Sequence, residues 1–193
     1  MSPRLPPPDR DLVERREILN ESGITRALQR MAFELIERSA APEEGIYLVG
    51  IRTGGAFLAN RLAALVRLQA PGTNVTVGAV DISLYRDDVF LGLPKPEIGP
   101  TELPVGVDGV TVVLVDDVLY TGRTIRAAMD VLADYGRPRA VRLAVLVDRG
   151  RRELPIQPDI VGVSVQTTAA ESVRVMLKER GELDRIVLRE RRE

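Results

Sequence analysis

One stretch of the sequence reads Val113-Leu-Val-Asp-Asp-Val-Leu-Tyr-Thr-Gly-Arg-Thr-Ile125. Its apolar start continues a β-branched run from Val110 and predicts a buried strand, at whose end two acids stand side by side. Thr-Gly-x-Thr then opens a predicted helix, and the unpaired N–H groups at a helix start favour a phosphate. Adjacent carboxylates can accept hydrogen bonds from the two hydroxyls of a ribose. The stretch therefore favours a sugar-phosphate site where a central strand ends.

The second half of this stretch also fits a plainer interpretation. Thr121 or Thr124 would be the N-cap of an ordinary helix, with the two acids near its positive end. For Thr-Gly-x-Thr alone this interpretation is preferable. A valine-rich strand, paired acids and a Thr-Gly pair in this order are hard to obtain by chance, so the whole stretch favours the binding site.

Strands and helices alternate on both sides of this stretch. Helices are predicted over residues 24–36, 56–69 and 124–135, strands over 46–51, 75–85, 110–115, 141–147, 160–165 and 186–188, and a weak helix or turn over 171–180. The alternation predicts an α/β fold with a central, mostly parallel sheet and helices on both faces. Ligands of such sheets bind beyond the carboxyl ends of the strands, where we find Arg52–Gly55, Asp116–Thr124 and Asp148–Arg152.

The chain length of 193 residues suits a single domain. Residues 1–16 are proline-rich and charged, so they are predicted to be a solvated tail that precedes a domain over residues 17–193. Residues 86–108 are rich in proline and glycine and show little periodicity. A loop of this length inside a compact domain is typically functional or disordered, and we expect a flexible loop there.

The composition excludes several kinds of chemistry. The chain contains no cysteine and no histidine, which excludes disulfides, the usual zinc sites and Ser/His/Asp or Cys/His catalysis. A metal would need oxygen ligands, which points to Mg²⁺. The net charge of −1 shows no global basic excess. No apolar run reaches the roughly 18 residues of a membrane span, and no signal peptide is recognisable, so the expected location is the cytoplasm.

The stretch from Val113 to Ile125 resembles the motif by which type I phosphoribosyltransferases bind 5-phosphoribosyl-1-pyrophosphate (PRPP). The resemblance implies that family's fold, a parallel sheet flanked by helices with a flexible hood. It also implies that Asp116 and Asp117 hold the ribose hydroxyls as catalytic residues, and that they meet Mg²⁺ only indirectly, through PRPP. The 5′-phosphate would be wrapped by Tyr120, Thr121, Gly122, Arg123 and Thr124.

A second glycine-containing turn, Val49-Gly-Ile-Arg-Thr-Gly-Gly55, follows the first predicted buried strand. By the same resemblance, Arg52, Thr53 and Gly54 would bind the pyrophosphate of PRPP. Similar sequences carry Thr-Arg-Gly where this chain has Thr-Gly-Gly, and we expect Arg52 to compensate for the missing cation. Arg86, at the start of the long loop, would swing onto the pyrophosphate and take part in catalysis. Taken alone, the turn also fits an ordinary strand-to-helix connection.

Two further segments narrow the resemblance. Ile82-Ser-Leu-Tyr-Arg-Asp-Asp88 and Val145-Leu-Val-Asp-Arg-Gly-Arg-Arg-Glu-Leu-Pro-Ile156 are similar to a family of bifunctional pyrimidine operon regulators and uracil phosphoribosyltransferases, over about residues 23–188. Purine-specific members have an acid where this chain has Tyr120. The resemblance implies that uracil and PRPP give UMP and pyrophosphate, with the base near Asp148, Arg149 and Gly150. From the residues alone, Asp148–Gly150 fits a tight turn with a structural ion pair.

The same resemblance implies binding to the leader RNA of pyrimidine genes, tightened by UMP or UTP. Arg30, Arg151 and Arg152 are the candidate RNA contacts, although an arginine-rich solvated surface explains them almost equally well. A homodimer or homotetramer is also implied. Two alternatives stay open: a regulator that keeps a nucleotide-sensing pocket but barely turns over, and a phosphoribosyltransferase for another base.

Overall fold

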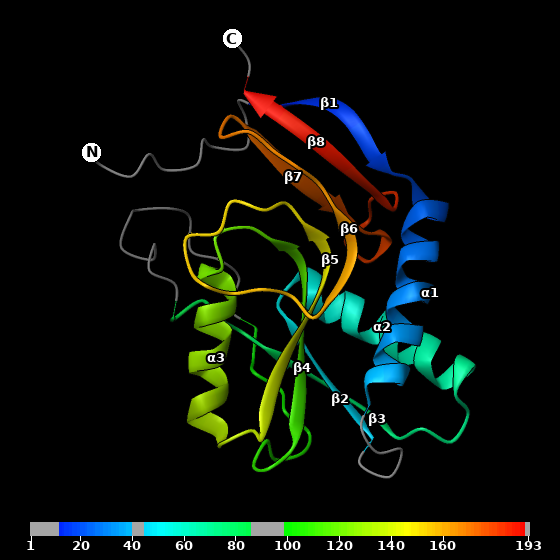
Figure 1. The fold of residues 1–193 in the computed structure, drawn as a ribbon, viewed down its shortest axis with the longest axis vertical. Coiled ribbons are helices and arrows are strands. Elements are labelled where there is room, and N and C mark those ends of the chain that lie inside the picture. Colours follow the sequence, from blue (N-terminus) through cyan, green and yellow to red (C-terminus); the bar gives the residue numbers. More distant parts are fainter. Residues whose placement is uncertain (1–11, 40–44, 86–98, 192–193) are drawn as a thin grey trace.

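A computed structural model describes residues 12–39, 45–85 and 99–191, which form two sheets and three α-helices (Figure 1). The elements are, in chain order, β1 (Leu12–Leu19), α1 (Glu21–Arg38), β2 (Ile46–Ile51), α2 (Gly54–Gln69), β3 (Val75–Val80), β4 (Thr111–Leu119), α3 (Arg123–Tyr135), β5 (Ala140–Asp148), β6 (Ile160–Ser164), β7 (Glu171–Met176), a short 3₁₀ helix (Lys178–Arg180) and β8 (Arg185–Arg191). None of the helices in these ranges is long and apolar enough to cross a membrane.

The larger sheet is parallel throughout and has the strand order β3-β2-β4-β5-β6. Its middle strand is β4, in which Val115 lies between Gly50 of β2 and Ala144 of β5. Helices α1 and α2 pack on one face and α3 covers the other (Figure 1). These observations confirm the predicted α/β fold with helices on both faces.

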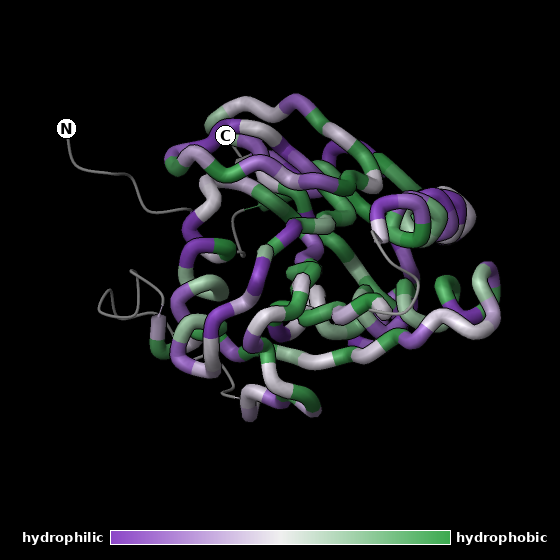
Figure 2. Tube along the Cα trace, turned by 60° about the horizontal axis from the view of Figure 1, so that its bottom comes forward, coloured by the Kyte–Doolittle hydropathy of each residue, from purple (hydrophilic) through white to green (hydrophobic). Residues whose placement is uncertain are grey.

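Alternating side chains of the same strands fill two separate cores. Leu48, Val113 and Val115 pack with α1 and α2, whereas Val49, Val112 and Leu114 pack with α3. A strand that is buried on both faces is predicted from its apolar run, as β2 and the first part of β4 were. Strand β4 continues through Asp116 and Asp117 to Leu119, beyond the predicted end at residue 115. In Figure 2 the chain is mainly hydrophobic through the middle of the molecule, where these strands run.

The smaller sheet is antiparallel and joins the two ends of the described chain in the order β1-β8-β7 (Figure 1). The predicted tail over residues 1–16 is therefore wrong for residues 12–16, which belong to β1. The predicted weak helix or turn over 171–180 is wrong for residues 171–176, which form β7. Both strands carry many charged residues, and their pairing with β8 gives no local signal in the sequence.

The expected flexible loop over residues 86–108 corresponds only in part to the structure. Residues 86–98 lie outside the described residues. In the remainder, Glu102 and Ala79 exchange two backbone hydrogen bonds of 2.8 Å, and Val107 is fully buried in the core under α3. The Tyr47 hydroxyl also donates to the Val105 carbonyl at 3.0 Å. Residues 99–107 are thus attached to the edge of the larger sheet.

Candidate active site

A cleft of about 450 Å³ lies at the carboxyl ends of β2 and β4. Its wall combines residues from five separate parts of the chain: Ile51–Gly54, Asp81–Ser83, Asp116–Val118, Thr124 and Arg180. The first, third and fourth of these belong to the two turns that the sequence singled out. The structure therefore brings the two acids, Thr124 and the predicted pyrophosphate turn together in one cavity, at the edge where parallel sheets bind ligands. The other predicted phosphate-binding residues, Tyr120–Arg123, do not line it.

Two acids form the floor of this cleft. Asp116 is only 6% exposed, and its carboxylate accepts a hydrogen bond of 2.9 Å from the N–H of Asp117. Burial, reinforced by the negative charge of Asp117, raises the pKa of Asp116 well above its ordinary value. Burial also raises the pKa of Asp117, against the opposing positive charge of Arg180. Hydroxyl donors or a cation would stabilise the charged forms of these two carboxylates. A ribose can supply the hydroxyls, and a metal-bound phosphate can supply the cation.

The predicted phosphate turn leads directly from β4 into α3. Gly122 is the N-cap of α3 with a φ of 94°, a left-handed conformation that favours glycine. The alternative with Thr121 or Thr124 as the N-cap residue is therefore wrong, although the Thr121 hydroxyl accepts a hydrogen bond of 3.4 Å from the Arg123 N–H. Thr124 lines the cleft, whereas Arg123 turns to an ion pair of 2.8 Å with Glu153. A helix start that lies beside two acids and whose N-cap residue is glycine suits the phosphate end of a sugar phosphate.

Residues 150–156 support the phosphate turn from outside the cleft. The Thr121 carbonyl accepts hydrogen bonds of 3.0 Å from the N–H groups of Glu153 and Leu154. The Arg152 guanidinium donates to the Tyr120 carbonyl at 3.0 Å. These bonds fix the carbonyls of the turn on its outer side and leave the start of α3 to the cleft.

The predicted pyrophosphate turn packs very closely on the two acids. A Cβ atom at Gly55 would lie 2.1 Å from the Val115 carbonyl oxygen, and one at Gly54 would lie 2.2 Å from a carboxylate oxygen of Asp117. The Arg52–Thr53 peptide bond in this turn is cis. The sequence indicated glycines for a tight turn, and the structure adds a second reason, which is the close approach of α2 to β4.

Arg52 lines the cleft, but residues 99–102 hold its guanidinium. It donates to the Pro100 carbonyl at 2.9 Å and pairs with Glu102 at 3.1 Å. The segment that follows β3 is ordered by Asp81, whose carboxylate accepts hydrogen bonds of 2.7 Å from the N–H groups of Ser83 and Gly99. Burial raises the pKa of Asp81, but these hydrogen bonds outweigh it and the net shift is downward. Arg86, the predicted catalytic arginine, lies outside the described residues.

Sequence reasoning missed three polar residues of the cleft wall, Asp81, Ser83 and Arg180. Asp81 and Ser83 fall inside the predicted strand 75–85, which ends at Val80 in the structure. Arg180 comes from the 3₁₀ helix after β7, at the base of the unpredicted antiparallel sheet. The acid in Asp81-Ile-Ser was a usable signal of a strand end, whereas nothing local to Arg180 indicated that it would reach the cleft.

The predicted base loop lies next to the phosphate turn. Asp148 accepts hydrogen bonds from the Gly150 N–H at 2.9 Å and from Arg152 at 2.7 Å, so the structural ion pair considered for this loop is present. Arg149 is 6% exposed and stacks on the Tyr120 ring, with its guanidinium carbon 3.9 Å from the ring centre. Burial lowers the pKa of Arg149.

The Arg149 guanidinium also donates to Thr167 at 3.2 Å and to the Glu171 carbonyl of β7 at 2.8 Å. Its contacts therefore join the base loop, the phosphate turn and the antiparallel sheet. Because the Arg149 guanidinium stacks on the Tyr120 ring and is hydrogen-bonded to two other residues, it supports Tyr120 and is not free to contact a ligand.

The three predicted RNA-binding arginines lie on different elements. Arg30 of α1 donates to the backbone carbonyl of Gly162 in β6. Arg152 directs its guanidinium inward, to Asp148, Tyr120 and the Ile156 carbonyl. Arg151 is exposed at a positive φ of 59° in the loop after β5. Of the three, Arg151 has the side chain best placed for an outside partner.

Solved structures with this fold belong to phosphoribosyltransferases. A hypoxanthine phosphoribosyltransferase from Staphylococcus aureus matches with a TM-score of 0.67 at 19% identity, covering 92% of this chain and 93% of that one. The hypoxanthine phosphoribosyltransferase of Trypanosoma cruzi matches with a TM-score of 0.65 at 16% identity, covering 93% and 98%. At these identities the likeness shows the fold alone.

The sequence comparisons show the family. The phosphoribosyl transferase domain family matches residues 14–180. A bifunctional protein PyrR of Chloroflexus aurantiacus is 50% identical over 173 residues, which cover 90% of this chain and 94% of that protein. Another, of Geobacter sp. (strain M21), is 53% identical over 158 residues, which cover 82% and 88%. The chain therefore belongs to the phosphoribosyltransferase family, and within it to the bifunctional PyrR proteins.

Proposed function

We propose that this protein is a uracil phosphoribosyltransferase, which joins uracil to PRPP to give UMP and pyrophosphate, and that it also regulates pyrimidine genes through their leader RNA. The observation that carries the catalytic part is the cleft that Asp116 and Asp117 share with Thr124, at the start of α3, and with the Arg52–Gly54 turn. The bifunctional names of the relatives at about half identity support the two roles together.

In the proposed reaction, the bond from the ribose anomeric carbon to pyrophosphate breaks and a bond from that carbon to N1 of uracil forms. The proton of N1 leaves to solvent or to the departing pyrophosphate. Asp116 and Asp117 would hold the ribose hydroxyls, and their negative charge would oppose the positive charge that develops on the sugar ring. Thr124 and the first N–H groups of α3 would hold the 5′-phosphate. Positioning of the two reactants would supply much of the rate enhancement.

The residues of the cleft fit the Mg²⁺ that this family implies. Within the described ranges no group of three acidic side chains forms a metal site of its own. The oxygen ligands that Mg²⁺ prefers would therefore come from PRPP, and Asp116 and Asp117 on the cleft floor would act on the ion indirectly, through PRPP. Mg²⁺ bound there would neutralise charge on the departing pyrophosphate.

Base choice would be set beside the phosphate turn. Tyr120, fixed by the stacked Arg149, stands next to the Asp148–Gly150 loop, whose backbone groups can read the imide edge of uracil. Tyr120 offers no carboxylate to a purine ring. We infer that uracil is accepted and that hypoxanthine and guanine are rejected.

A panel of bases tests the catalytic proposal. Purified protein is incubated with PRPP and Mg²⁺ and, separately, uracil, orotate, hypoxanthine or guanine, and the nucleotides are separated by chromatography. We expect UMP from uracil and no purine nucleotide. A purine or orotate nucleotide in place of UMP would show that the enzyme uses another base. If no base gave a product, the protein would be a regulator that binds nucleotides without efficient turnover.

Titration with a pyrimidine leader RNA tests the regulatory proposal. In a gel-shift assay we expect binding at micromolar protein or below that tightens when UMP is added. Arg151→Gln should weaken the complex because Arg151 is exposed and free to reach a phosphate. An RNA affinity that does not change when UMP is added would contradict the regulatory role.

We further propose that the protein acts as a homodimer or homotetramer, as the resemblance implies, and in the cytoplasm, where leader transcripts are made. Size-exclusion chromatography with light scattering measures the first of these directly. A purely monomeric protein at working concentration would contradict it.

A further inference from the structure

Among the residues that the structure describes, two cationic side chains line the cleft, Arg52 and Arg180, and they differ in their bonding partners. Arg52 is bound to the Pro100 carbonyl and to Glu102. Arg180 is exposed, and its guanidinium makes no hydrogen bond or ion pair with any residue in the described ranges. Arg180 is therefore the cation of this wall that is available to a ligand.

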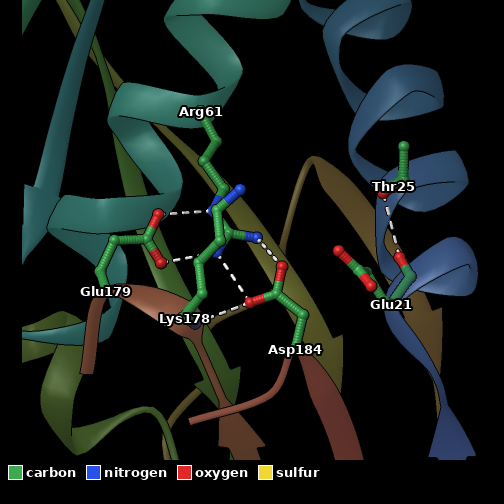
Figure 3. Close-up of polar contacts among 6 residues, drawn as sticks. All are labelled: Glu21, Thr25, Arg61, Lys178, Glu179 and Asp184. Carbon is green, nitrogen blue, oxygen red and sulfur yellow. Dashed lines mark hydrogen bonds and ion pairs between the residues drawn. The ribbon is translucent and has the colours of Figure 1, made fainter. Parts of the chain in front are cut away.

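The backbone around Arg180 is held firmly although its side chain is free. Figure 3 shows Arg61 of α2 reaching between Glu179 and Asp184, with hydrogen bonds of 2.7 Å to the former and 2.8 Å to the latter. Asp184 also accepts a hydrogen bond of 2.8 Å from the Lys178 N–H (Figure 3). These three bonds anchor the Lys178–Arg180 helix to the larger sheet, so that a cation is presented to the cleft from a fixed point.

Arg180 and the Arg52–Gly55 turn share the cleft wall and both lie near the carboxylate of Asp117. The carboxylate of Asp117 touches the position that a side chain at Gly54 would take. The positive charge of Arg180 acts on that same carboxylate. The Arg52–Gly55 turn offers backbone groups, the side chain of Thr53 and one arginine that is already paired. Arg180 therefore supplies a positive charge that this turn does not have free.

We propose that Arg180 binds the pyrophosphate group of PRPP and of the product, and that the Arg61–Glu179–Asp184 cluster positions it for this contact. The inference rests on the proposed function in taking the Arg52–Gly55 turn as the pyrophosphate side. A guanidinium fits two phosphate oxygens in a bidentate contact, and its charge balances that of the leaving group. Arg180 is then a specific determinant of pyrophosphate affinity, and it comes from the short helix that connects β7 to β8 of the antiparallel sheet.

Calorimetric titration of Arg180→Gln with pyrophosphate and Mg²⁺, and separately with UMP, tests this inference. We expect pyrophosphate affinity to fall about tenfold or more, as the loss of a charge-assisted hydrogen bond predicts, and the KM for PRPP to rise in parallel. UMP carries no pyrophosphate, so its affinity should stay within about twofold. Lys178→Gln is the matched control, because it removes a positive charge from the same short helix at a residue that does not line the cleft.

The outcomes separate this inference from the proposed function. Equal weakening of pyrophosphate and UMP, or no change in either, would overturn the role of Arg180. So would a wild-type protein that does not bind pyrophosphate. If the wild type made no UMP while Arg180→Gln selectively lost pyrophosphate, the site would stand and the proposed activity would fall. If Arg180→Gln formed UMP normally and bound pyrophosphate as the wild type does, the proposed activity would stand and the role of Arg180 would be contradicted.

Discussion

A buried acid without a cation beside it is costly, and Asp116 is such a residue. It is nearly inaccessible, it accepts one backbone hydrogen bond, and it lies next to a second acid. Because burial raises its pKa, the folded protein binds a proton more tightly at this site than the unfolded chain does. Stability must then fall as pH rises from the ordinary pKa of an aspartate through the raised value. The role in ligand binding that we propose for Asp116 therefore opposes the stability of the ligand-free fold.

Asp116→Asn is expected to make the ligand-free protein more stable at neutral pH, because the amide removes a buried charge and keeps the accepting oxygen. Each unit of raised pKa corresponds to about 1.4 kcal/mol, and about 1 kcal/mol raises Tm by about 2–4 °C in a chain of this length. Thermal denaturation from pH 5 to 8 measures both effects. The wild type should lose stability with rising pH more steeply than Asp116→Asn, and parallel curves would contradict this account.

At the scale of elements, the site depends on how closely α2 approaches the end of β4. Gly55 has no room for a side chain because the Val115 carbonyl occupies that space. The turn therefore brings its N–H groups over the two acids, where an anion can meet both. A larger residue would have to push the start of α2 away from the sheet.

Gly55→Ala is expected to destabilise the fold by at least about 2 kcal/mol, because its Cβ atom would overlap backbone rather than a movable side chain. Gly106→Ala is the matched control, since a Cβ atom there meets nothing within 4 Å. Urea denaturation of both variants gives the comparison. Similar stabilities for the two would show that α2 can shift at little cost.

The sequence predicted the elements of the larger sheet well and those of the smaller sheet poorly, for a physical reason. Strand β2 is buried along its whole length, so its apolar run is visible without knowledge of its neighbours. Strand β1 is mostly exposed and is stabilised by pairing with β8 at the other end of the chain. Arg180 was missed for the same reason, whereas Asp116, Asp117 and Thr124 lie beside local signals and were found.

For the molecule as a whole, Arg61 connects the two sheets. It joins α2, which packs on the larger sheet, to both ends of the segment that links β7 to β8 (Figure 3). Hydrogen bonds to Glu179 and Asp184 raise the pKa of Arg61, and its own hydrogen bonds lower the pKa of each acid. The stability from this cluster is therefore present above the ordinary carboxylate pKa and is lost as pH falls through the lowered values.

Arg61→Met is expected to destabilise the protein by about 2–4 kcal/mol, because it leaves the nearly buried Asp184 without its cation. It should also weaken pyrophosphate binding, because Arg180 loses its fixed support, while UMP binding changes less. Denaturation and calorimetry on the same preparation measure the two effects. If Arg61→Met lowered the stability but left pyrophosphate affinity unchanged, the Arg61–Glu179–Asp184 cluster would have no role in positioning Arg180.

The most direct test is the rate at which Asp117→Asn forms UMP from uracil and PRPP. It asks whether the ribosyl phosphate group is transferred at the cleft that contains Asp116 and Asp117. We predict a fall in turnover of tenfold or more, at about 1.4 kcal/mol per tenfold, in a variant that remains folded. Asp130→Asn, on the exposed side of α3, should turn over like the wild type. An Asp117→Asn variant as active as the wild type would contradict the assignment of the cleft.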